Sequence, residues 1–318
     1  MKNVVYNTHK GIQYYGDSFK LIQDKEFLKE FSGKINLIFT SPPFDLKNPK
    51  EYGNLVETEY IEWLSDFALP LSNLLTADGS IVIELGNSWN RNLPTFDLTP
   101  IKTLIKFQEK GQLHLCQEII CQNPSRLPSP ATYVNKDRIR LKDSYTRLWW
   151  FSKTPNPKAD NSKILIPYSD SMQKLIKNKK FNSGIRPSGH NISPKGFLKD
   201  NGGAILSTFI KKNIEINNSF EFSNTNSDSN YYKFCSDNNL RRHPARMQKE
   251  IVEIFVKFLT DSNDTVLDIF SGSNTTGFVA EKLNRNWVSI DLDLDYCIGS
   301  SIRFLKEDES LQILKKKL

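Results

Sequence analysis

The sequence has few cysteines and no long hydrophobic run. Its four cysteines, Cys116, Cys121, Cys235 and Cys297, include no C-x-x-C pair and have no histidine at ligand spacing. Neither a zinc site nor a disulfide framework is therefore expected. No stretch approaches the roughly 20 apolar residues of a bilayer-spanning helix, and residues 1–10 lack the apolar core of a signal peptide. These absences predict a cytoplasmic protein without a metal or a membrane anchor.

Positive charge is concentrated in the middle of the chain. The whole sequence has a net charge of +7. Residues 154–242 contain 14 Lys and Arg against 7 Asp and Glu, so the remainder of the chain is close to neutral. A basic segment joined to a neutral domain is expected of a protein that binds a phosphate backbone. A lysine-rich solvated surface would have the same composition.

Short apolar runs alternate with helical patterns on both sides of this basic segment. Seven runs predict strands, at residues 11–15, 35–40, 80–85, 113–121, 145–152, 265–270 and 287–291. Helices are predicted over residues 57–75, 99–111, 251–259, 275–283 and 294–305, with Pro70 kinking or dividing the first. Thr99 is predicted to be the N-cap of the second of these helices, with Pro100 at the first helical position. Asp78-Gly79 is predicted to form a turn before the strand at residues 80–85. The alternation predicts an α/β fold with a doubly wound, mostly parallel sheet.

The basic segment has poor periodicity. Residues 213–239 contain so many Asn and Ser that part of them is expected to be loop or disordered without a partner. We therefore predict one domain in two parts, residues 1–153 and 243–318, with residues 154–242 inserted as a separate unit.

A loop of small residues follows the predicted strand 265–270. Residues 266–277 read VLDIFSGSNTTG, and glycine in such a loop lets a ligand approach the backbone closely. Asp291 ends the next strand, about 20 residues later, where an acid can accept hydrogen bonds from ribose hydroxyls. A dinucleotide fingerprint G-x-G-x-x-G and a P-loop lysine are both missing. A plain strand–helix turn remains the structural alternative.

The strand at residues 35–40 ends in Ser41-Pro42-Pro43-Phe44. Two prolines fix the backbone and remove two N–H donors, so carbonyl oxygens can point outward as acceptors. The Ser41 hydroxyl adds another acceptor, and Phe44 adds a flat face. Such a turn can hold a planar group that carries an NH2, although a strand-ending turn with a core phenylalanine has the same sequence.

Together these two motifs resemble the amino-group DNA methyltransferases of bacterial restriction–modification systems. The catalytic motif of that family has the form [DNS]-P-P-[YFW], and its serine version is typical of enzymes that methylate the N4 amine of cytosine. The motif order, with the cofactor loop last, resembles the beta class. The resemblance implies a Rossmann-like, seven-stranded methyltransferase sheet, S-adenosyl-L-methionine as cofactor, double-stranded DNA as substrate, flipping of the target base, and a cognate restriction endonuclease that acts separately.

The resemblance also implies roles for individual residues. Ser41, Pro42, Pro43 and Phe44 would be catalytic. Cofactor contacts would come from Asp17, His243, Pro244, Ala245, Asp268, Phe270, Ser271, Gly272, Ser273, Asn274, Thr275 and Asp291. Asn274 departs from the family where many members have a second glycine, which would place a polar side chain beside the cofactor. Contacts with DNA are predicted for basic residues of the middle segment, Arg186, Lys195, Lys199, Arg241 and Arg242.

Several alternatives stay open on the sequence. An N6-adenine methyltransferase shares every motif, and a nucleic-acid-binding protein that has lost activity would retain the fold. An RNA substrate is a further alternative. A cytosine C5 methyltransferase needs Pro-Cys-Gln, whereas Cys116 and Cys121 follow Leu115 and Ile120.

Overall fold

The computed structural model describes residues 3–43, 57–179, 183–193, 199–211, 214–218, 226–244 and 247–316. Within these residues, nine strands form one sheet in the order β1–β2–β11–β10–β3–β4–β6–β5–β9. The strands are β1 Asn3–Asn7, β2 Gly11–Tyr15, β3 Ile35–Thr40, β4 Leu75–Leu85, β5 His114–Gln122, β6 Tyr145–Ser152, β9 Phe209–Ile210, β10 Thr265–Asp268 and β11 Asn286–Asp291.

The strand directions place most strand ends along one edge of the sheet. β2, β11, β10, β3 and β4 are parallel to one another. β6 is antiparallel to both β4 and β5, so β5 runs in the same direction as β4. The carboxyl ends of β2, β11, β10, β3, β4 and β5 therefore lie on the same side, which we call the carboxyl edge. Ligands of doubly wound sheets bind beyond this edge.

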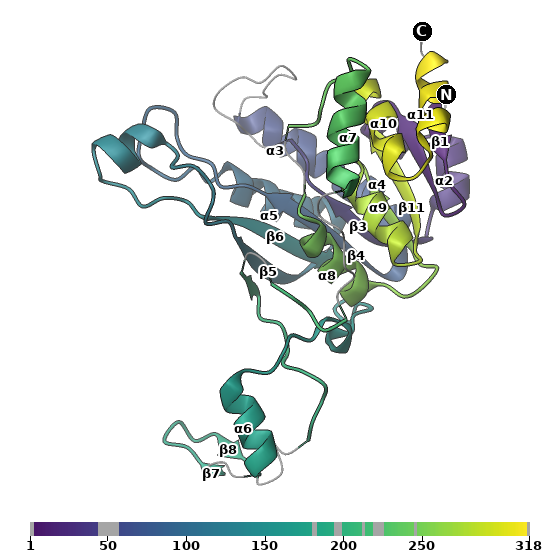
Figure 1. Cartoon of the computed structure of the whole chain (residues 1–318). Helices are drawn as coiled ribbons and strands as arrows, with labels where there is room; N and C mark the ends of the chain where they lie inside the picture. Colours follow the sequence, from purple (N-terminus) through teal and green to yellow (C-terminus); the bar gives the residue numbers. More distant parts are fainter. Residues whose placement is uncertain are drawn as a thin grey trace.

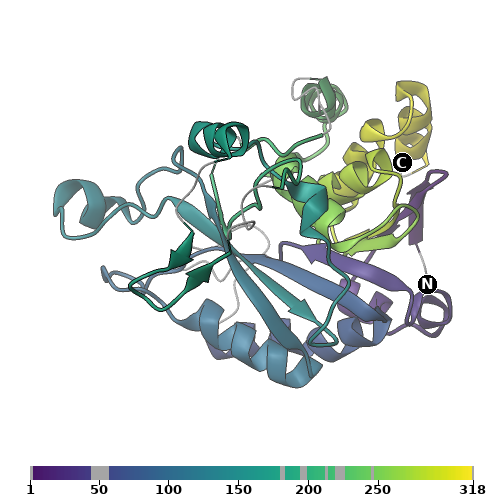
Figure 2. The ribbon, with the colours of Figure 1, turned by 90° about the horizontal axis from the view of Figure 1, so that it is seen from below.

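Helices cover both faces of the sheet (Figures 1 and 2). Ile38 on β3 belongs to an apolar cluster that includes Phe67 and Phe107, whereas Phe39 belongs to a second cluster that includes Phe255. The alternation follows from the two-residue repeat of a strand.

The helices are α1 Ser18–Leu21, α2 Lys25–Phe31, α3 Glu57–Asp66, α4 Ala68–Leu74, α5 Thr99–Gly111, α6 Asp170–Asn178, α7 Asn226–Asp237, α8 Lys249–Leu259, α9 Thr275–Lys282, α10 Leu294–Ser300 and α11 Glu307–Lys315.

The predicted α/β sheet is confirmed, with small corrections. All seven predicted strands are present, and β1 and β9 are added at the two ends of the sheet. The predicted helix 57–75 is divided before Pro70, between α3 and α4. Thr99 is the first residue of α5 rather than its N-cap, because the Asp97 carboxylate accepts hydrogen bonds from the Thr99 backbone N–H at 2.9 Å and from its hydroxyl at 2.7 Å.

Two further predictions need correction. The expected turn at Asp78-Gly79 lies within β4, where the register against β3 shifts. The helix predicted over residues 294–305 ends as α10 and continues as a short 3-10 turn, Ser301–Arg303. The Asn- and Ser-rich segment, part of which is expected to be loop, has no helix or strand over residues 214–218. It also contains the helix α7, because Tyr231, Phe234 and Cys235 are buried against Ile298 of α10.

Two projections leave the body of the molecule (Figure 1). One carries α6 and a small hairpin of β7 (Gly184–Ile185) and β8 (Asn191–Ile192). The other consists of residues 123–144, between β5 and β6, and contains one turn of π-helix at Thr132–Lys136. Among the described residues, none of the helices has the length and apolar character needed to cross a membrane.

Candidate active site

The ends of β3 and β10 are joined by a buried carboxylate. Asp268, the last residue of β10, is 5% exposed. Its two oxygens accept hydrogen bonds from the hydroxyls of Thr40 at 2.8 Å and Thr276 at 2.7 Å, and the Phe270 N–H donates to it at 3.1 Å. Burial raises the pKa of Asp268 to about 6. The two motifs found in the sequence are therefore neighbours at the carboxyl edge, and Asp268 fixes their relative position.

Two residues of the loop after β10, Gly272 and Asn274, have a positive φ. Gly272 has a φ of +50°, and a Cβ there would lie 2.8 Å from the His243 ring. The His243 ring thus packs directly on the loop. Asn274 has a φ of 52°, within the left-handed region that asparagine tolerates.

The sequence predicts that the Asn274 side chain lies beside the cofactor, but in the structure this side chain points into the core. It is fully buried. Its Nδ2 donates to the Tyr6 hydroxyl at 3.2 Å and to Gln13 Oε1 at 3.0 Å, while its Oδ1 accepts from the Ser289 hydroxyl at 2.8 Å. The asparagine therefore adopts the backbone angles of a glycine and ties the loop to β1, β2 and β11.

Asp291 closes the other side of the same loop. Its carboxylate accepts hydrogen bonds from the Gly272 N–H at 2.6 Å and the Asp293 N–H at 2.9 Å. Its backbone oxygen accepts from the Gly16 N–H at 2.9 Å. Burial raises the pKa of Asp291 to about 6. The carboxylate and the backbone oxygen of Asp291 together organise the ends of β2, β10 and β11.

Asp17 lies at the end of β2, two strands from β10. Its carboxylate caps α1 by accepting from the Phe19 and Lys20 N–H groups, and its side chain is 45% exposed. The neighbouring Ser18 hydroxyl donates to the Ile269 backbone oxygen at 2.5 Å. This bond joins the start of α1 to the end of β10.

These surroundings fit S-adenosyl-L-methionine. The ligand combines a nucleoside with an amino acid, and the site offers two partly exposed carboxylates around a loop whose glycine has no room for a side chain. Phe270 supplies a half-buried ring that packs on Trp63 and Phe67 at centroid distances of 5.7 and 5.4 Å. Ser271, Ser273 and Thr275 are buried, so these three side chains shape the loop from within.

Ser41 is hydrogen-bonded to an acid that the sequence analysis did not single out. Its Oγ donates to Glu84 Oε2 at 2.9 Å. Glu84 is the penultimate residue of β4, the strand next to β3. Burial raises the pKa of Glu84 above its ordinary range, and the Ser41 hydrogen bond and the charge of Arg126 act in the opposite direction.

The rest of the Ser41 turn is only partly described. Pro42 is buried and Pro43 is exposed. The Tyr60 hydroxyl donates to the Pro43 backbone oxygen at 2.8 Å, so α3 holds the turn from one side. The predicted site residues Phe44, Lys195 and Ala245 lie outside the described residues.

Asn87 is a second residue that the sequence analysis missed. It follows the end of β4 and is 6% exposed. Neither Oδ1 nor Nδ2 has a hydrogen-bond partner within the part of the chain that the structure describes. Native proteins pair most buried polar atoms. The sequence offers a signal for both residues. Glu84 is the one charged residue in the strand sequence S-I-V-I-E-L, and Asn87 follows two residues after its end.

The residues predicted to bind DNA do not form one cluster. Arg186 is exposed on the β7–β8 hairpin, where its backbone N–H and oxygen close the turn with His190 and Gly189, and Lys199 is exposed after β8. Arg241 instead pairs with Asp293 at 2.9 Å, beside the end of β11. The Arg242 guanidinium lies 5.6 Å from the centre of the Tyr232 ring on α7. Figure 1 shows α7 and the β7–β8 hairpin at opposite ends of the molecule.

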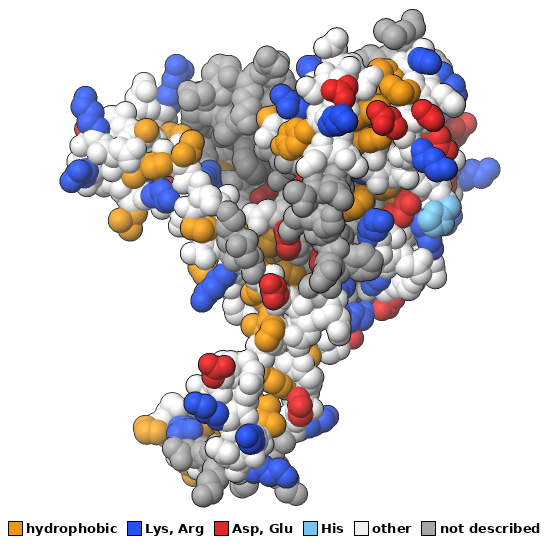
Figure 3. All heavy atoms as spheres, viewed as in Figure 1, with side chains coloured by type: hydrophobic (Ala, Val, Ile, Leu, Met, Phe, Trp, Pro, Cys, Tyr) orange, Lys and Arg blue, Asp and Glu red, His pale blue; other side chains and the backbone are white. Residues whose placement is uncertain are grey.

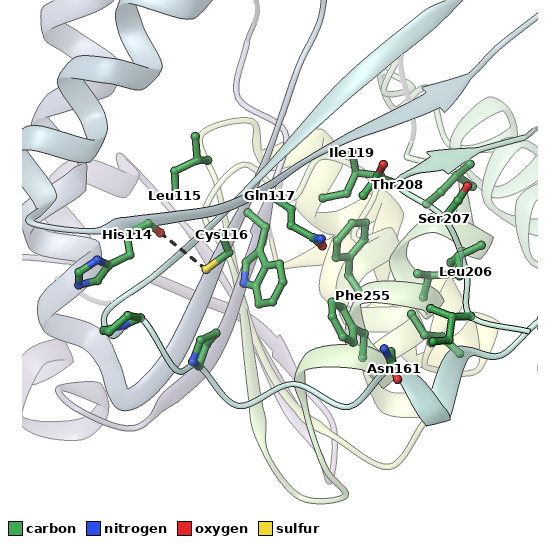
Figure 4. Close-up of a pocket in the computed structure, with 18 residues that line it drawn as sticks. His114, Leu115, Cys116, Gln117, Ile119, Asn161, Leu206, Ser207, Thr208 and Phe255 are labelled. Carbon is green, nitrogen blue, oxygen red and sulfur yellow. Dashed lines mark hydrogen bonds between the residues drawn. The ribbon is translucent and has the colours of Figure 1, made fainter. Parts of the chain in front are cut away.

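A cavity of about 570 Å³ lies away from this site (Figure 4). It is bounded by β5, β6, α8 and residues 205–210, and its walls include Cys116, Trp150 and Phe255. It extends along the amino-terminal part of β5, from His114 to Ile119. None of the predicted site residues that the structure describes lines it, so the carboxyl edge remains the candidate active site.

Known proteins resemble this chain in sequence and structure. Residues 35–300 match the N6/N4 DNA methylase family. The chain is 40% identical over 311 residues to the Type II methyltransferase M.PvuII of Proteus hauseri, covering 97% of this chain and 88% of that protein. It is 24% identical over 283 residues to the Type II methyltransferase M.BglII of Bacillus subtilis, covering 89% and 66% of the two chains.

Two solved structures extend the comparison. The PvuII DNA methyltransferase, described as cytosine-N4-specific, aligns with a TM-score of 0.71 and 32% identity over 99% of this chain and 95% of that one. A putative DNA modification methylase from Thermus thermophilus, complexed with S-adenosyl-L-methionine, aligns with a TM-score of 0.54 and 15% identity over 94% of both chains. At that identity the second match supports the fold alone.

Proposed function

The chain belongs to the N6/N4 DNA methylase family, and we propose that it transfers a methyl group from S-adenosyl-L-methionine to the N4 amine of a cytosine within a specific sequence of double-stranded DNA. The observation that carries this proposal is the Ser41–Glu84 pair, which is held near the Gly272 loop because the adjacent Thr40 is hydrogen-bonded to Asp268. The similarity to a cytosine-N4-specific methyltransferase over 99% of the chain supports the choice of base.

The cofactor would lie along the ends of β2, β11 and β10. When bound, S-adenosyl-L-methionine supplies a methyl group that is activated by its sulfonium. Asp291 and Asp17 would accept hydrogen bonds from the ribose hydroxyls and the adenine amine. Gly272 would let the backbone approach the ligand, with Ser271, Ser273, Asn274 and Thr275 holding the loop in shape. His243, Pro244 and Ala245 would enclose the methionine part, and Phe270 would contact the nucleoside.

The target base would enter beside Ser41. An amine inside a duplex is inaccessible, so the cytosine must flip out, at a cost of a few kcal/mol. Stacking on Phe44 would return roughly 1–3 kcal/mol of this cost. The Ser41 oxygen and the Pro42 backbone oxygen would accept the two amine hydrogens, while Pro43 keeps the turn rigid.

Glu84 orients the Ser41 hydroxyl for this role. Because the Ser41 proton is directed at Glu84, the oxygen lone pairs remain available for the amine. Hydrogen bonds to the amine increase the electron density on nitrogen as it attacks the methyl carbon, and such preorganised acceptors lower the barrier. The nitrogen becomes positively charged during transfer. Its proton then passes to Ser41 Oγ while the hydroxyl proton moves to Glu84.

Asn87 is positioned on the base side of the site. In the sheet order β11–β10–β3–β4, the strand that precedes Asn87 lies beyond β3 from the cofactor loop. Burying an unpaired polar group costs about 1–3 kcal/mol. A ligand that pairs with it would remove this cost, and the carboxamide can donate to ring N3 or O2 of a flipped cytosine.

Recognition of the sequence would fall to residues 154–242, inserted between the catalytic parts 1–153 and 243–318. Its basic residues Arg186, Lys195, Lys199, Arg241 and Arg242 would contact phosphates or bases. The protein would act in the cytoplasm, because its relatives are bacterial proteins and bacterial DNA lies in the cytoplasm. A restriction endonuclease of the same specificity would act on that DNA as a separate protein.

Transfer of a radiolabelled methyl group tests this proposal. We expect the wild-type protein, incubated with labelled S-adenosyl-L-methionine, to label unmethylated duplex DNA. Ser41→Ala should reduce the transfer rate by about 10²–10³-fold, the usual loss of one preorganised hydrogen-bonding group, while calorimetry shows an unchanged cofactor affinity. A protein that binds the cofactor but labels no DNA would contradict the proposed substrate. Equal losses of affinity and rate would contradict the role of Ser41.

A further inference from the structure

The projection formed by residues 123–144, here called the arm, begins at the active-site side of the sheet. It leaves β5 after Gln122 and returns to β6 at Tyr145, and the Asn123 N–H donates to the Ser144 backbone oxygen at 2.6 Å across its base. Because β5 runs in the same direction as β3, the arm leaves from the carboxyl edge, where Ser41 lies. Figure 1 shows it extending away from the body at the left.

The arm is held in place by hydrogen bonds to residues outside it. Arg140 donates to the Pro94 backbone oxygen at 2.7 Å, and the Tyr133 hydroxyl donates to the Asn92 backbone oxygen at 2.5 Å. Arg126 donates to the Tyr145 backbone oxygen at 3.0 Å. Prolines at positions 124, 128 and 130 restrict the backbone further. A segment held in this way loses little conformational entropy when it binds a partner.

The base of the arm is coupled to the active site by charge. Arg126 is the cation whose field acts on the Glu84 carboxylate. Glu84 in turn accepts the hydrogen bond from Ser41. The base of the arm therefore lies on the side of the group proposed to receive the target amine.

The outer part of the arm exposes both cations and apolar side chains. Residues 123–144 contain five Lys and Arg and two Asp, and Lys136 and Arg138 are exposed. Leu127 is 80% exposed, Ile139 65% and Leu141 89%. Figure 3 shows hydrophobic side chains among Lys and Arg side chains on the arm. Clustered exposed apolar groups indicate a surface that a partner covers.

We infer that the arm is a second DNA-binding element, in which Lys136 and Arg138 contact phosphates and the exposed Leu127, Ile139 and Leu141 pack against the groove beside the flipped base. The inference rests on the proposed function and adds a surface outside the basic middle segment. Cations beside apolar side chains are the combination that kinking and groove-binding proteins present to DNA. A second copy of this chain fits the arm poorly, because both copies carry a net charge of +7.

The salt dependence of DNA binding tests the cationic part. Each phosphate contact contributes about 0.9 to the slope of log K against log salt. The double variant Lys136→Ala/Arg138→Ala should therefore lower the slope for an unmethylated duplex by about 1.8, measured by fluorescence anisotropy with the full-length protein. The matched control Lys315→Ala/Lys316→Ala removes the same charge from the end of α11 and should leave the slope unchanged. An unchanged slope in the arm variant would overturn the inference.

The apolar part has a different signature. Leu127→Ser/Leu141→Ser should weaken duplex binding about tenfold at every salt concentration without changing the slope, because apolar burial releases no counterions. Wild-type affinity in this variant would remove the apolar side chains from the interface. A change in sedimentation coefficient in any arm variant would identify the arm as a contact between copies, which also overturns the inference.

The two proposals can fail separately. If the wild-type protein methylates DNA and the arm variants bind it as the wild type does, the arm inference alone is wrong. If the wild-type protein binds the cofactor but neither binds nor methylates DNA, the proposed function itself is wrong. Cofactor calorimetry on each variant verifies that the fold is intact.

Discussion

Replacing Glu84 by glutamine separates the charge of this residue from its shape. The variant Glu84→Gln keeps an oxygen that can accept the Ser41 hydrogen bond, now 2.9 Å long, but that acceptor is neutral. A hydrogen bond to a charged group contributes about 1.5–3 kcal/mol and a neutral one about 0.5–1.5 kcal/mol. If about 1.4 kcal/mol of the difference is expressed in the transition state, the methyl-transfer rate falls about tenfold, and the loss of Glu84 as the acceptor of the hydroxyl proton lowers it further.

Stability should change in the opposite direction. Burial raises the pKa of Glu84, so its charged form is disfavoured in the folded protein. For such an acid, the stabilisation is present at low pH and is lost as the pH rises through the folded-state pKa. At neutral pH the charge is therefore a cost, and Glu84→Gln should melt at the same temperature as the wild type or higher.

Single-turnover methylation across pH, with enzyme, DNA and cofactor pre-bound, measures the effect. The wild-type rate should fall at low pH as Glu84 gains a proton, and the glutamine variant should lose this dependence. The matched control Glu109→Gln changes an exposed residue of α5 and should behave as the wild type. A Glu84→Gln rate within twofold of the wild type, with the same pH profile, would show that the Ser41–Glu84 hydrogen bond does not assist transfer.

Two other perturbations give distinct results. Because the pKa of Asp291 is raised to about 6, and its carboxylate accepts from the Gly272 N–H, calorimetry should show cofactor affinity falling as the pH drops below about 6. The Asp291→Asn variant should bind the cofactor weakly at every pH, with a smaller pH dependence that comes from Asp268. A wild-type pH profile in this variant would show that Asp291 does not take part in cofactor binding. Asn87→Leu should raise the melting temperature, because it removes a buried amide that has no hydrogen-bond partner among the described residues. It should also lower the methylation rate about tenfold through the lost base contact; a stabilised variant with full activity would assign Asn87 no role.

Much of the fold could be predicted because its signals are local. The run I-N-L-I-F-T followed by Ser41-Pro42-Pro43 marks both a buried strand and its end. The small-residue loop at Gly272 identifies a strand–loop–helix unit in the same way. These patterns depend on side chains that are close in sequence, so neighbouring residues suffice to read them.

The missed features depend on contacts between distant residues. Ser41 meets Glu84 only because β3 and β4 pair in a particular register. Asn274 points into the core because Tyr6 and Gln13 lie beneath it. The helix α7 forms in an Asn- and Ser-rich stretch because α10 covers its apolar side. Tertiary packing overrides weak local preference at such positions.

The identity of the methylated base tests the central claim most directly. Unmethylated DNA of mixed sequence would be incubated with the protein and S-adenosyl-L-methionine, digested to nucleosides and analysed by mass spectrometry. We expect N4-methylcytosine, and its absence with the Ser41→Ala variant. N6-methyladenine in its place would contradict the assignment of cytosine, and DNA without any methylated base would contradict the assignment of a DNA methyltransferase activity to this site.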